Sequence, residues 1–339
     1  MKLYGAVDLH SNNSYVAISD EKDQVIRHKR LPNDLESIDS FFKDYKDDLS
    51  DIVVESTFNG YWLVDGLKDR GYGVKLAHMI ACGPYAGLRY ADDKSDSLWL
   101  NRMNRLGVLP TGYIYPRQDR PIRDILRKRM YLVQMRTGLW NSLKHLSYTS
   151  NTEPLKRRFL VSAEEPSTER LFPDPFTQAS ANSLLGTIQT LNKKLSEIAS
   201  LVRKNTKTDP VVDRLLKIGG IGFILAWVIR FESGPVERFA TDKNFLSYCG
   251  LAPTTRISNQ KKKGSPSQRS YNHYLRWAFA EMVVTSLKNP TMRRYHDRLV
   301  RRKGKIKAKA IISSKFARII YRVMREPDFV YDPVKLFGI

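Results

Sequence analysis

The first 77 residues alternate short β-rich runs with polar turns, and this order constrains the fold more than any other feature of the chain. Runs at 4–9, 15–19 and 25–28 follow one another with only turn-forming residues between them, which is typical of a meander of antiparallel strands. Patterns for a helix, a buried strand, a second helix and a last strand come next. They lie at 35–45, 51–55, 61–69 and 73–77.

Three antiparallel strands followed by helix, strand, helix and strand is the order of an RNase H-like α/β fold. The sequence therefore predicts an α/β domain at 1–115, followed by all-α domains at 116–207 and 208–339. A chain of 339 residues is too long for a single core, which agrees with such a division.

Two long segments in the middle of the chain repeat apolar or small residues at alternating steps of three and four. They span 126–140 and 184–202, and their spacing predicts a coiled-coil hairpin in the 116–207 domain. The connection at 150–180 contains four prolines and is expected to be an irregular loop. The two helices either pack on one another within the chain, or they form a subunit interface or grip nucleic acid.

A glycine turn marks the start of the C-terminal domain. Ile218-Gly-Gly-Ile-Gly222 lies between two helical patterns and is similar to the turn of a helix-hairpin-helix, whose exposed amides hold a DNA phosphate. Gly220 and Gly222 would then contact nucleic acid. The alternative is that these glycines serve only close helix packing. A polar loop at 254–268 is followed by further helices and by a basic stretch at 293–309.

The charge of the chain is unevenly distributed and indicates a polyanionic partner. The net charge is +22, and residues 1–70 hold 9 basic and 14 acidic side chains whereas residues 251–339 hold 21 and 5. The basic residues are mixed with Tyr and Trp over many segments, which favours nucleic acid over a membrane surface. Without a run of 18 apolar residues or a signal peptide, we expect a cytoplasmic, nucleoid-associated protein with no membrane partner.

The two cysteines, Cys82 and Cys249, have neither a CxxC spacing nor a histidine at ligand distance in the sequence. This pattern argues against structural zinc and against disulfides. We expect both to be small buried hydrophobic residues.

Four carboxylates have the surroundings of a metal site. Asp8 lies among apolar residues in the first strand, where a carboxylate must be paired or bind a cation. Glu55 ends the second buried run, at the sheet edge where sites form. Asp93 and Asp96 are three residues apart and face the same way on a helix. Oxygen ligands without His or Cys indicate Mg²⁺ or Mn²⁺, which serve phosphodiester chemistry. Taken singly, Asp93 could also cap a helix and Glu55 could be a sheet-edge charge.

These residues resemble those of a family of insertion-sequence transposases. Asp8 in Gly-Ala-Val-Asp-Leu-His, Glu55 in Val-Val-Glu-Ser-Thr and the Asp-x-x-Asp of 93 and 96 are similar to the DEDD tetrad of members with a RuvC-like N-terminal domain. The C-terminal domain of that family has a Gly-Ile-Gly turn, an aromatic-rich helix, Gly-Leu-x-Pro and a serine. Here the corresponding residues are Gly220-Ile-Gly222, 239–248, Gly250-Leu-Ala-Pro253 and Ser258.

The resemblance implies a DNA recombinase in which Ser258 attacks DNA while the carboxylates bind Mg²⁺. It also implies guidance by a structured non-coding bridge RNA, and dimers that pair as a tetramer. A phosphoserine link would retain the bond energy until the hydroxyl of a second strand displaces the serine. Two questions stay open, namely whether the site is completed between subunits and whether the reaction is transposition or inversion.

Alternatives to two of these assignments lie close by in the sequence. Asp92 competes with Asp93 as a ligand, although only Asp93 keeps the three-residue spacing to Asp96. Ser258 keeps the family's distance from Pro253, but three nearby serines compete with it as nucleophile, Ser265, Ser267 and Ser270.

Two groups of basic residues are candidates for nucleic-acid contacts. The group around the serine is expected to neutralise DNA phosphates, and comprises Arg256, Lys261, Lys262, Lys263 and Arg276. The group at the start of the first long helix suits the phosphates of a folded RNA, and equally suits a solvated helix face. It comprises Arg117, Arg120, Arg123, Arg127, Lys128, Arg129 and Arg136.

Three other functions use the same residues. A Mg²⁺-dependent junction nuclease would cut with water, with Ser258 only contacting a phosphate. A site-specific DNA invertase would share the serine chemistry. A non-catalytic nucleic-acid-binding protein would use the carboxylates for folding alone. A covalent protein–DNA adduct separates the first and third of these from a serine recombinase.

Overall fold

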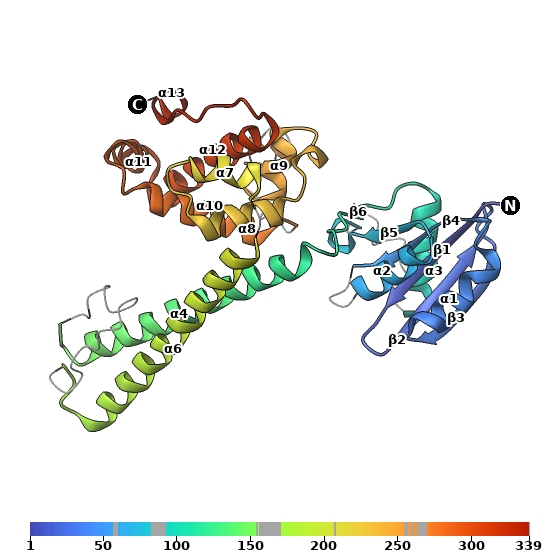
Figure 1. The fold of residues 1–339 in the computed structure, drawn as a ribbon, viewed down its shortest axis with the longest axis horizontal. Helices are drawn as coiled ribbons and strands as arrows, with labels where there is room; N and C mark the ends of the chain where they lie inside the picture. The colour runs from blue at the N-terminus through green and yellow to red at the C-terminus, as the bar shows by residue number, and fades with distance from the viewer. Residues whose placement is uncertain are drawn as a thin grey trace. The chain divides into compact units, whose positions relative to one another are not determined.

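The computed structural model describes most of the chain, namely residues 1–56, 60–82, 93–153, 155, 171–206, 208–253, 257–258, 261–262 and 270–338. They belong to two compact units, Met1–Arg117 and Gln118–Ile339, drawn in Figure 1. The boundary predicted after residue 115 lies two residues from the observed one. The second unit contains both segments predicted as all-α domains. Within the described ranges, no helix is long and apolar enough to cross a membrane.

A six-stranded sheet forms the centre of the first unit, in the order β3-β2-β1-β4-β5-β6. Its central strand, β1, pairs antiparallel with β2 and parallel with β4. This mixed order is compatible with the predicted RNase H-like fold. The strands are β1 (Leu3–Leu9), β2 (Asn13–Ser19), β3 (Val25–Pro32), β4 (Leu49–Glu55), β5 (Val74–Ala77) and β6 (Thr111–Gly112).

Helices cover both faces of this sheet (Figure 1). The helices α1 (Leu35–Phe42), which a 3₁₀ turn follows, and α2 (Tyr61–Asp69) pack on one face, in a core with Val7, Val16 and Val54. The helix α3 (Asp93–Arg105) packs on the other face through Trp99, Leu100 and Met103. Because side chains alternate along a strand, each strand sends one set of residues into each layer.

The predicted elements of this unit are confirmed as elements, with ends that shift by a few residues. Both helices and all five predicted strands are present, and β3 continues to Pro32 beyond the predicted end at residue 28. The sequence pattern did not reveal β6, a two-residue strand that pairs antiparallel with β5.

The second unit begins with a hairpin of two long helices, α4 (Arg120–Thr149) and α6 (Pro175–Asn205), which lie against each other. The predicted positions on α6 are buried or half-buried, among them Ile188, Leu191 and Leu195. The predicted loop extends too far, because α6 begins at Pro175. Proline is tolerated in a first helical turn, and the Asp174 side chain caps this one by accepting a hydrogen bond from the Thr177 amide.

The rest of the second unit is a bundle of shorter helices around α12. Its core includes Phe245, Phe279 and Phe316, all fully buried, and burying side chains of this size stabilises the fold by about 1.5–3 kcal/mol each. The elements are α7 (Pro210–Leu216), α8 (Phe223–Ser233), the 3₁₀ turn η4 (Val236–Arg238), α9 (Asp242–Tyr248), β7 (Ile257–Ser258), β8 (Lys261–Lys262), α10 (His273–Ser286), α11 (Pro290–Lys303), α12 (Lys305–Arg325) and α13 (Pro333–Phe337).

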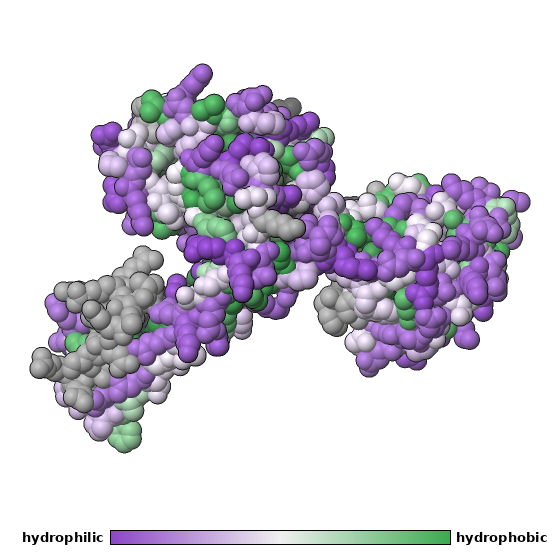
Figure 2. Space-filling view, in the orientation of Figure 1, coloured by the Kyte–Doolittle hydropathy of each residue, from purple (hydrophilic) through white to green (hydrophobic). Residues whose placement is uncertain are grey.

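The hairpin and the bundle share one core. Leu126 of α4 and Val202 of α6 are buried in the same cluster as the bundle helices, which explains why both segments belong to one unit. The basic stretch predicted at 293–309 is divided between α11 and the start of α12. The side chains visible on the surface of each unit are mostly hydrophilic (Figure 2), consistent with a mean hydropathy of −0.43.

Candidate functional site

Two of the predicted carboxylates lie at the ends of adjacent parallel strands in the first unit. Val7 of β1 is paired with Val54 of β4, and Asp8 and Glu55 follow directly on each strand. The carboxyl ends of parallel strands meet at one edge of the sheet, so this register makes Asp8 and Glu55 neighbours.

Both carboxylates also lie on the face that α3 covers. Ala6 and Val53 contribute to the core beneath α3, and residues two positions along a strand share a face. Asp8 and Glu55 are therefore directed to the same layer. Asp8 is 1% exposed, whereas Glu55 is half-buried.

The helix α3 carries the other two predicted ligands at its N-terminal end. Asp96 is buried and lies one turn before Leu100, which packs on the sheet, so Asp96 faces the same layer as Asp8. Asp93 is the first residue of α3, and its side chain lies outside the described part of the structure. The competing ligand Asp92 also lies outside the described residues.

Hydrogen bonds fix α3 on this face of the sheet. The Asn101 amide donates to the Tyr4 carbonyl at 2.9 Å, and the Ser97 hydroxyl lies 3.0 Å from His28 Nε2 on β3. These contacts set the height of α3 above the ends of β1 and β4.

A histidine that the sequence reasoning did not consider accompanies Asp8. His10 Nε2 lies 3.2 Å from Asp8 Oδ2, and the His10 ring meets the Tyr15 ring edge-on at 6.3 Å between centroids. The two-residue spacing between Asp8 and His10, which directs both to one side of a strand, was the available signal.

The donor set on this face suits a hard divalent cation. Asp8, Glu55 and Asp96 offer only oxygen atoms, the ligand type that Mg²⁺ and Mn²⁺ prefer. Among the side chains that the structure describes, which leave out Asp93, no group of three or more His, Cys, Asp or Glu could hold a metal ion as the chain stands. The metal site therefore stays a prediction that includes Asp93.

The predicted nucleophile lies on a small two-stranded sheet in the second unit. Ser258 of β7 is paired antiparallel with Lys261 of β8, and Ile257 is paired with Lys262. Only the backbone of these residues is described. Arg256 and Lys263, and the competing serines Ser265 and Ser267, lie outside the described residues. Ser270 is described and half-buried.

The two glycines of the predicted turn differ in their surroundings. Gly220 has a φ of +101°, and a Cβ built there would lie 2.9 Å from the Met282 carbonyl oxygen on α10. Gly222 is exposed, has a φ of −98°, and precedes α8 without a side-chain cap. Gly220 thus serves close helix packing, which the sequence left as an alternative. The first amides of α8 at Gly222 keep the arrangement expected for a phosphate contact.

Arg123 and Arg127, predicted to contact nucleic acid, bind a buried glutamate in this structure. Glu232 of α8 is 3% exposed and lies 3.1 Å from Arg123 Nη2, and Arg127 Nη2 donates to its Oε2 at 2.8 Å. Burial raises the pKa of Glu232, but the hydrogen bond from Arg127 and the charges of Arg123 and Arg127 outweigh burial, so the pKa lies below the ordinary glutamate value. The side chain is therefore a carboxylate at neutral pH.

The same carboxylate reaches α10 through Asn272. The side-chain Nδ2 of Asn272 donates a hydrogen bond to Glu232 Oε2 at 2.8 Å. Its side-chain Oδ1 accepts hydrogen bonds from the backbone amides of Tyr274 and Leu275, so Asn272 is the N-cap of α10. Arg127 also stacks on the Tyr274 ring at 4.2 Å. No local sequence signal marks this network, because its partners are far apart in the chain.

The other predicted basic residues have varied surroundings. Arg117 pairs with Asp69 and Asp65, and Arg136 donates to Asn192 across the hairpin at 2.8 Å. Arg276 is exposed on α10 and lies 5.0 Å above the Tyr271 ring. It borders a cavity treated below.

Comparison with known proteins gives two relatives and one family. Residues 212–297, which include Ser258, match the model of the transposase IS116/IS110/IS902 family. A probable family 20 transposase of Pseudomonas aeruginosa is 23% identical over 290 residues, covering 80% of this chain and 83% of that protein. An uncharacterised protein of insertion element IS110 from Streptomyces coelicolor is 26% identical over 150 residues, covering 43% of this chain and 37% of that protein.

The matched segment begins in α7 and ends in α11, so it covers the glycine turn, α8, α9, the β7–β8 hairpin and α10. The longer alignment, with the Pseudomonas aeruginosa protein, extends the similarity over most of the chain. The chain is thus similar to insertion-sequence transposases, through the IS116/IS110/IS902 family model at residues 212–297 and through its two relatives.

Proposed function

We propose that this chain is a transposase that cuts and rejoins DNA through a covalent phosphoserine intermediate formed by Ser258, with Mg²⁺ held by Asp8, Glu55, Asp93 and Asp96. The observation that carries the proposal is the register of β1 and β4, which makes Asp8 and Glu55 neighbours at one sheet edge beneath α3. Asp8 is deeply buried beside His10 Nε2, which lies 3.2 Å from its Oδ2, and a divalent cation at the sheet edge would stabilise its charge further. The all-oxygen donor set supports Mg²⁺ as that cation.

The reaction assigned to Ser258 exchanges one phosphodiester bond for another and therefore needs no ATP. The serine oxygen attacks phosphorus, the bond from phosphorus to one DNA oxygen breaks, and that oxygen leaves as a hydroxyl after taking a proton. The hydroxyl of a second strand then attacks the phosphoserine, and the serine regains its proton. When bound, Mg²⁺ would neutralise charge on the phosphate and favour departure of the leaving oxygen.

Basic residues around the serine support DNA as the substrate. Lys261 and Lys262 follow Ser258 on the paired strand β8, and Arg276 is exposed on the next helix. Such cations lower the cost of bringing a phosphate close to a nucleophile. The exposed amides at Gly222 offer a further phosphate contact.

A guide RNA and a tetramer of paired dimers complete the proposal. Both rest on the family resemblance, and the net charge of +22 agrees with a protein that binds more than one nucleic acid. Sequencing the RNA that co-purifies with the protein tests the first. Light scattering with and without DNA tests the second.

The decisive experiment is adduct trapping on denaturing gels, with labelled DNA that carries the ends of the element. The wild type should give a Mg²⁺-dependent protein–DNA adduct, and Ser258→Ala should give none while still binding DNA. Ser270→Ala is the matched control and should keep the adduct. If Ser258→Ala keeps the adduct, the assignment fails. Free DNA ends without any adduct would indicate a junction nuclease.

The carboxylates are tested in the same assay. Asp8→Asn and Glu55→Gln should lose the adduct and keep the fold. Asp51→Asn is the matched control. Asp51 lies on β4 and on the same face as Glu55, but it is four residues away from Glu55 and pairs with Lys75, with 2.6 Å between Oδ2 and Nζ. An adduct that survives in Asp8→Asn and Glu55→Gln would show that these carboxylates serve folding alone.

A further inference from the structure

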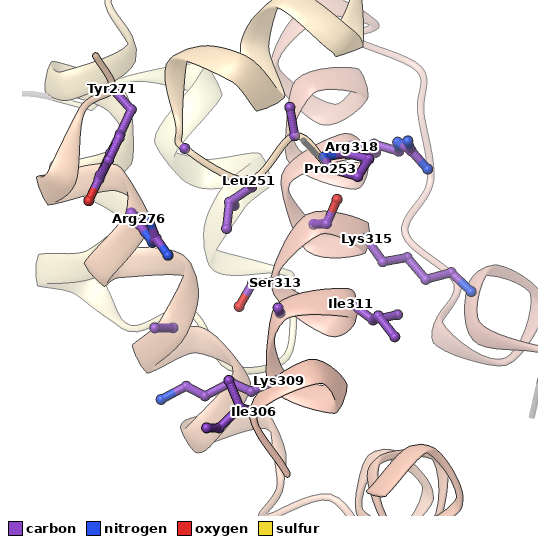
Figure 3. A pocket seen from close by; sticks show the side chains of 15 residues that line it. Leu251, Pro253, Tyr271, Arg276, Ile306, Lys309, Ile311, Ser313, Lys315 and Arg318 are labelled. Carbon is purple, nitrogen blue, oxygen red and sulfur yellow. The ribbon is translucent and has the colours of Figure 1, made fainter. Parts of the chain in front are cut away.

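The second unit contains a cavity of about 850 Å³ between the segment after α9, the first half of α10 and the first half of α12 (Figure 3). Its lining runs along the chain as far as Pro253 and resumes at Tyr271. The segment between these two residues carries Ser258. Lining residues of the cavity therefore both precede and follow the proposed nucleophile in the sequence.

The lining combines apolar surface with positive charge. Leu251, Pro253 and Ile306 supply apolar atoms, and every charged side chain among the lining residues that the structure describes is a cation. Figure 3 shows Arg276 and Lys309 on one side of the cavity, while Lys315 and Arg318 extend toward the other. A ligand with an apolar body and an anionic group satisfies both properties.

The wall at Tyr271 is preformed. Gly250 has a φ of +67°, and a Cβ built on it would lie 2.6 Å from the Tyr271 ring, so backbone and ring are in direct contact. The backbone N–H of the next residue, Asn272, donates a hydrogen bond to the backbone carbonyl of Tyr248 at 2.7 Å. A ring held in this way keeps its position without a ligand, which lowers the entropy cost of binding.

The opposite wall is held against α10 as well. The Ser313 hydroxyl of α12 donates to the Phe279 carbonyl of α10 at 3.4 Å, and Phe316 and Phe279 share the core behind it. The two walls therefore keep their separation.

Arg276 and Tyr271 lie next to each other in the lining of the cavity. The Arg276 guanidinium lies 5.0 Å from the Tyr271 ring centroid. Flat aromatic and guanidinium groups are the surfaces on which unpaired nucleobases stack. Lys309, on the same side of the cavity (Figure 3), would neutralise the phosphate of such a nucleotide.

We propose that this cavity receives one unstacked nucleotide of the DNA strand that is cut. The inference rests on the proposed function, because it takes DNA as the substrate and Ser258 as the nucleophile. A strand that is exchanged must leave its duplex, and a base held outside the stack prevents the original pairing from re-forming. A base pair inside a duplex cannot enter such a cavity.

The probe is a 30-base-pair DNA duplex that carries one bulged 2-aminopurine, compared with the same duplex without the bulge, at one salt concentration. The wild type should bind the bulged duplex about five- to hundredfold more tightly, the range that stacking of one base gives. The 2-aminopurine fluorescence should change on binding because the base enters a new stack.

Filling the cavity should remove this preference. Ala280→Trp places a large ring in the cavity from α10, and Ile306→Trp does so from α12, where Ile306 is 88% exposed and its replacement leaves the core intact. Lys309→Ala should weaken binding of the bulged duplex. Lys307→Ala is its matched control, because Lys307 is exposed on the same helix but does not line the cavity.

The possible outcomes test the nucleotide-binding cavity separately from the proposed Ser258 chemistry. A bulge preference that persists in both tryptophan variants overturns the cavity proposal, even when the Ser258 adduct forms. A bulge preference lost in both variants supports it, even when no adduct forms in the wild type. A preference seen only with a bulged RNA duplex would overturn the choice of DNA.

Discussion

Arg127 of α4 donates a hydrogen bond to the carboxylate of Glu232 on α8, with 2.8 Å between Nη2 and Oε2. The two residues are 105 positions apart in the chain. Their contact joins the helical hairpin to the bundle, and Asn272 extends it to α10. A buried carboxylate of this kind contributes to stability only while all its partners are present.

We expect Glu232→Gln to lower the free energy of unfolding by about 3–5 kcal/mol, because it leaves Arg123 and Arg127 facing a neutral group in a buried site. Chemical denaturation followed by circular dichroism measures the change. Asp213→Asn on the exposed side of α7 is the control and should be near neutral. A loss below about 1 kcal/mol in Glu232→Gln would contradict the importance of the network.

The lowered pKa of Glu232 predicts how stability depends on pH. A carboxyl group with a lower pKa in the folded state contributes its full stability above its unfolded pKa, and loses that contribution as the pH falls through the folded value. The wild type should therefore lose melting temperature more steeply than Glu232→Gln as the pH falls below 4.5, the ordinary glutamate pKa. If the melting temperatures of the two proteins fell in parallel with pH, the lowered pKa of Glu232 would be contradicted.

Gly220 and Gly222 should respond differently to alanine. Gly220→Ala is expected to cost about 1–3 kcal/mol, because it strains a positive φ and brings a Cβ against the Met282 carbonyl. Gly222→Ala has open space around the new Cβ and should leave stability nearly unchanged. Thermal unfolding compares them. Equal losses would show that the turn does not distinguish the two positions.

Both cysteines should be protected in the folded protein. Cys82 and Cys249 are 3% and 0% exposed, and burial raises the pKa of the Cys249 thiol despite the opposing charge of Arg238. Thiols react as thiolates, so a thiol reagent should label neither residue in native buffer and both in denaturant. Rapid labelling of Cys249 in native buffer would contradict its burial.

The sequence predicted the first unit well because strands and turns are local features. The apolar runs of β1 and β4 identified Asp8 and Glu55 as unusual, since a carboxylate in or at the end of a buried run stands out. The register that makes them neighbours depends on pairing between distant strands, and only the three-dimensional structure supplies it.

The second unit contains contacts that local patterns do not reveal. Arg123 and Arg127 form part of a basic group that suggested an RNA-binding face, yet their guanidinium groups contact Glu232. Glu232 follows Phe231 near a helix end, where a solvated glutamate is ordinary. The ion pairs join residues about 100 positions apart, so no local sequence pattern predicts them. The start of α6 was missed because a proline-rich segment resembles a loop until Asp174 is recognised as a cap.

The length of the hairpin has a geometric consequence. The 30 residues of α4 span about 45 Å, and the network at Arg127, Glu232 and Asn272 joins its first turns to the residue next to Tyr271. The base of the hairpin is thus anchored by hydrogen bonds beside the cavity wall, and the far end of α4 lies several helical turns away from that anchor.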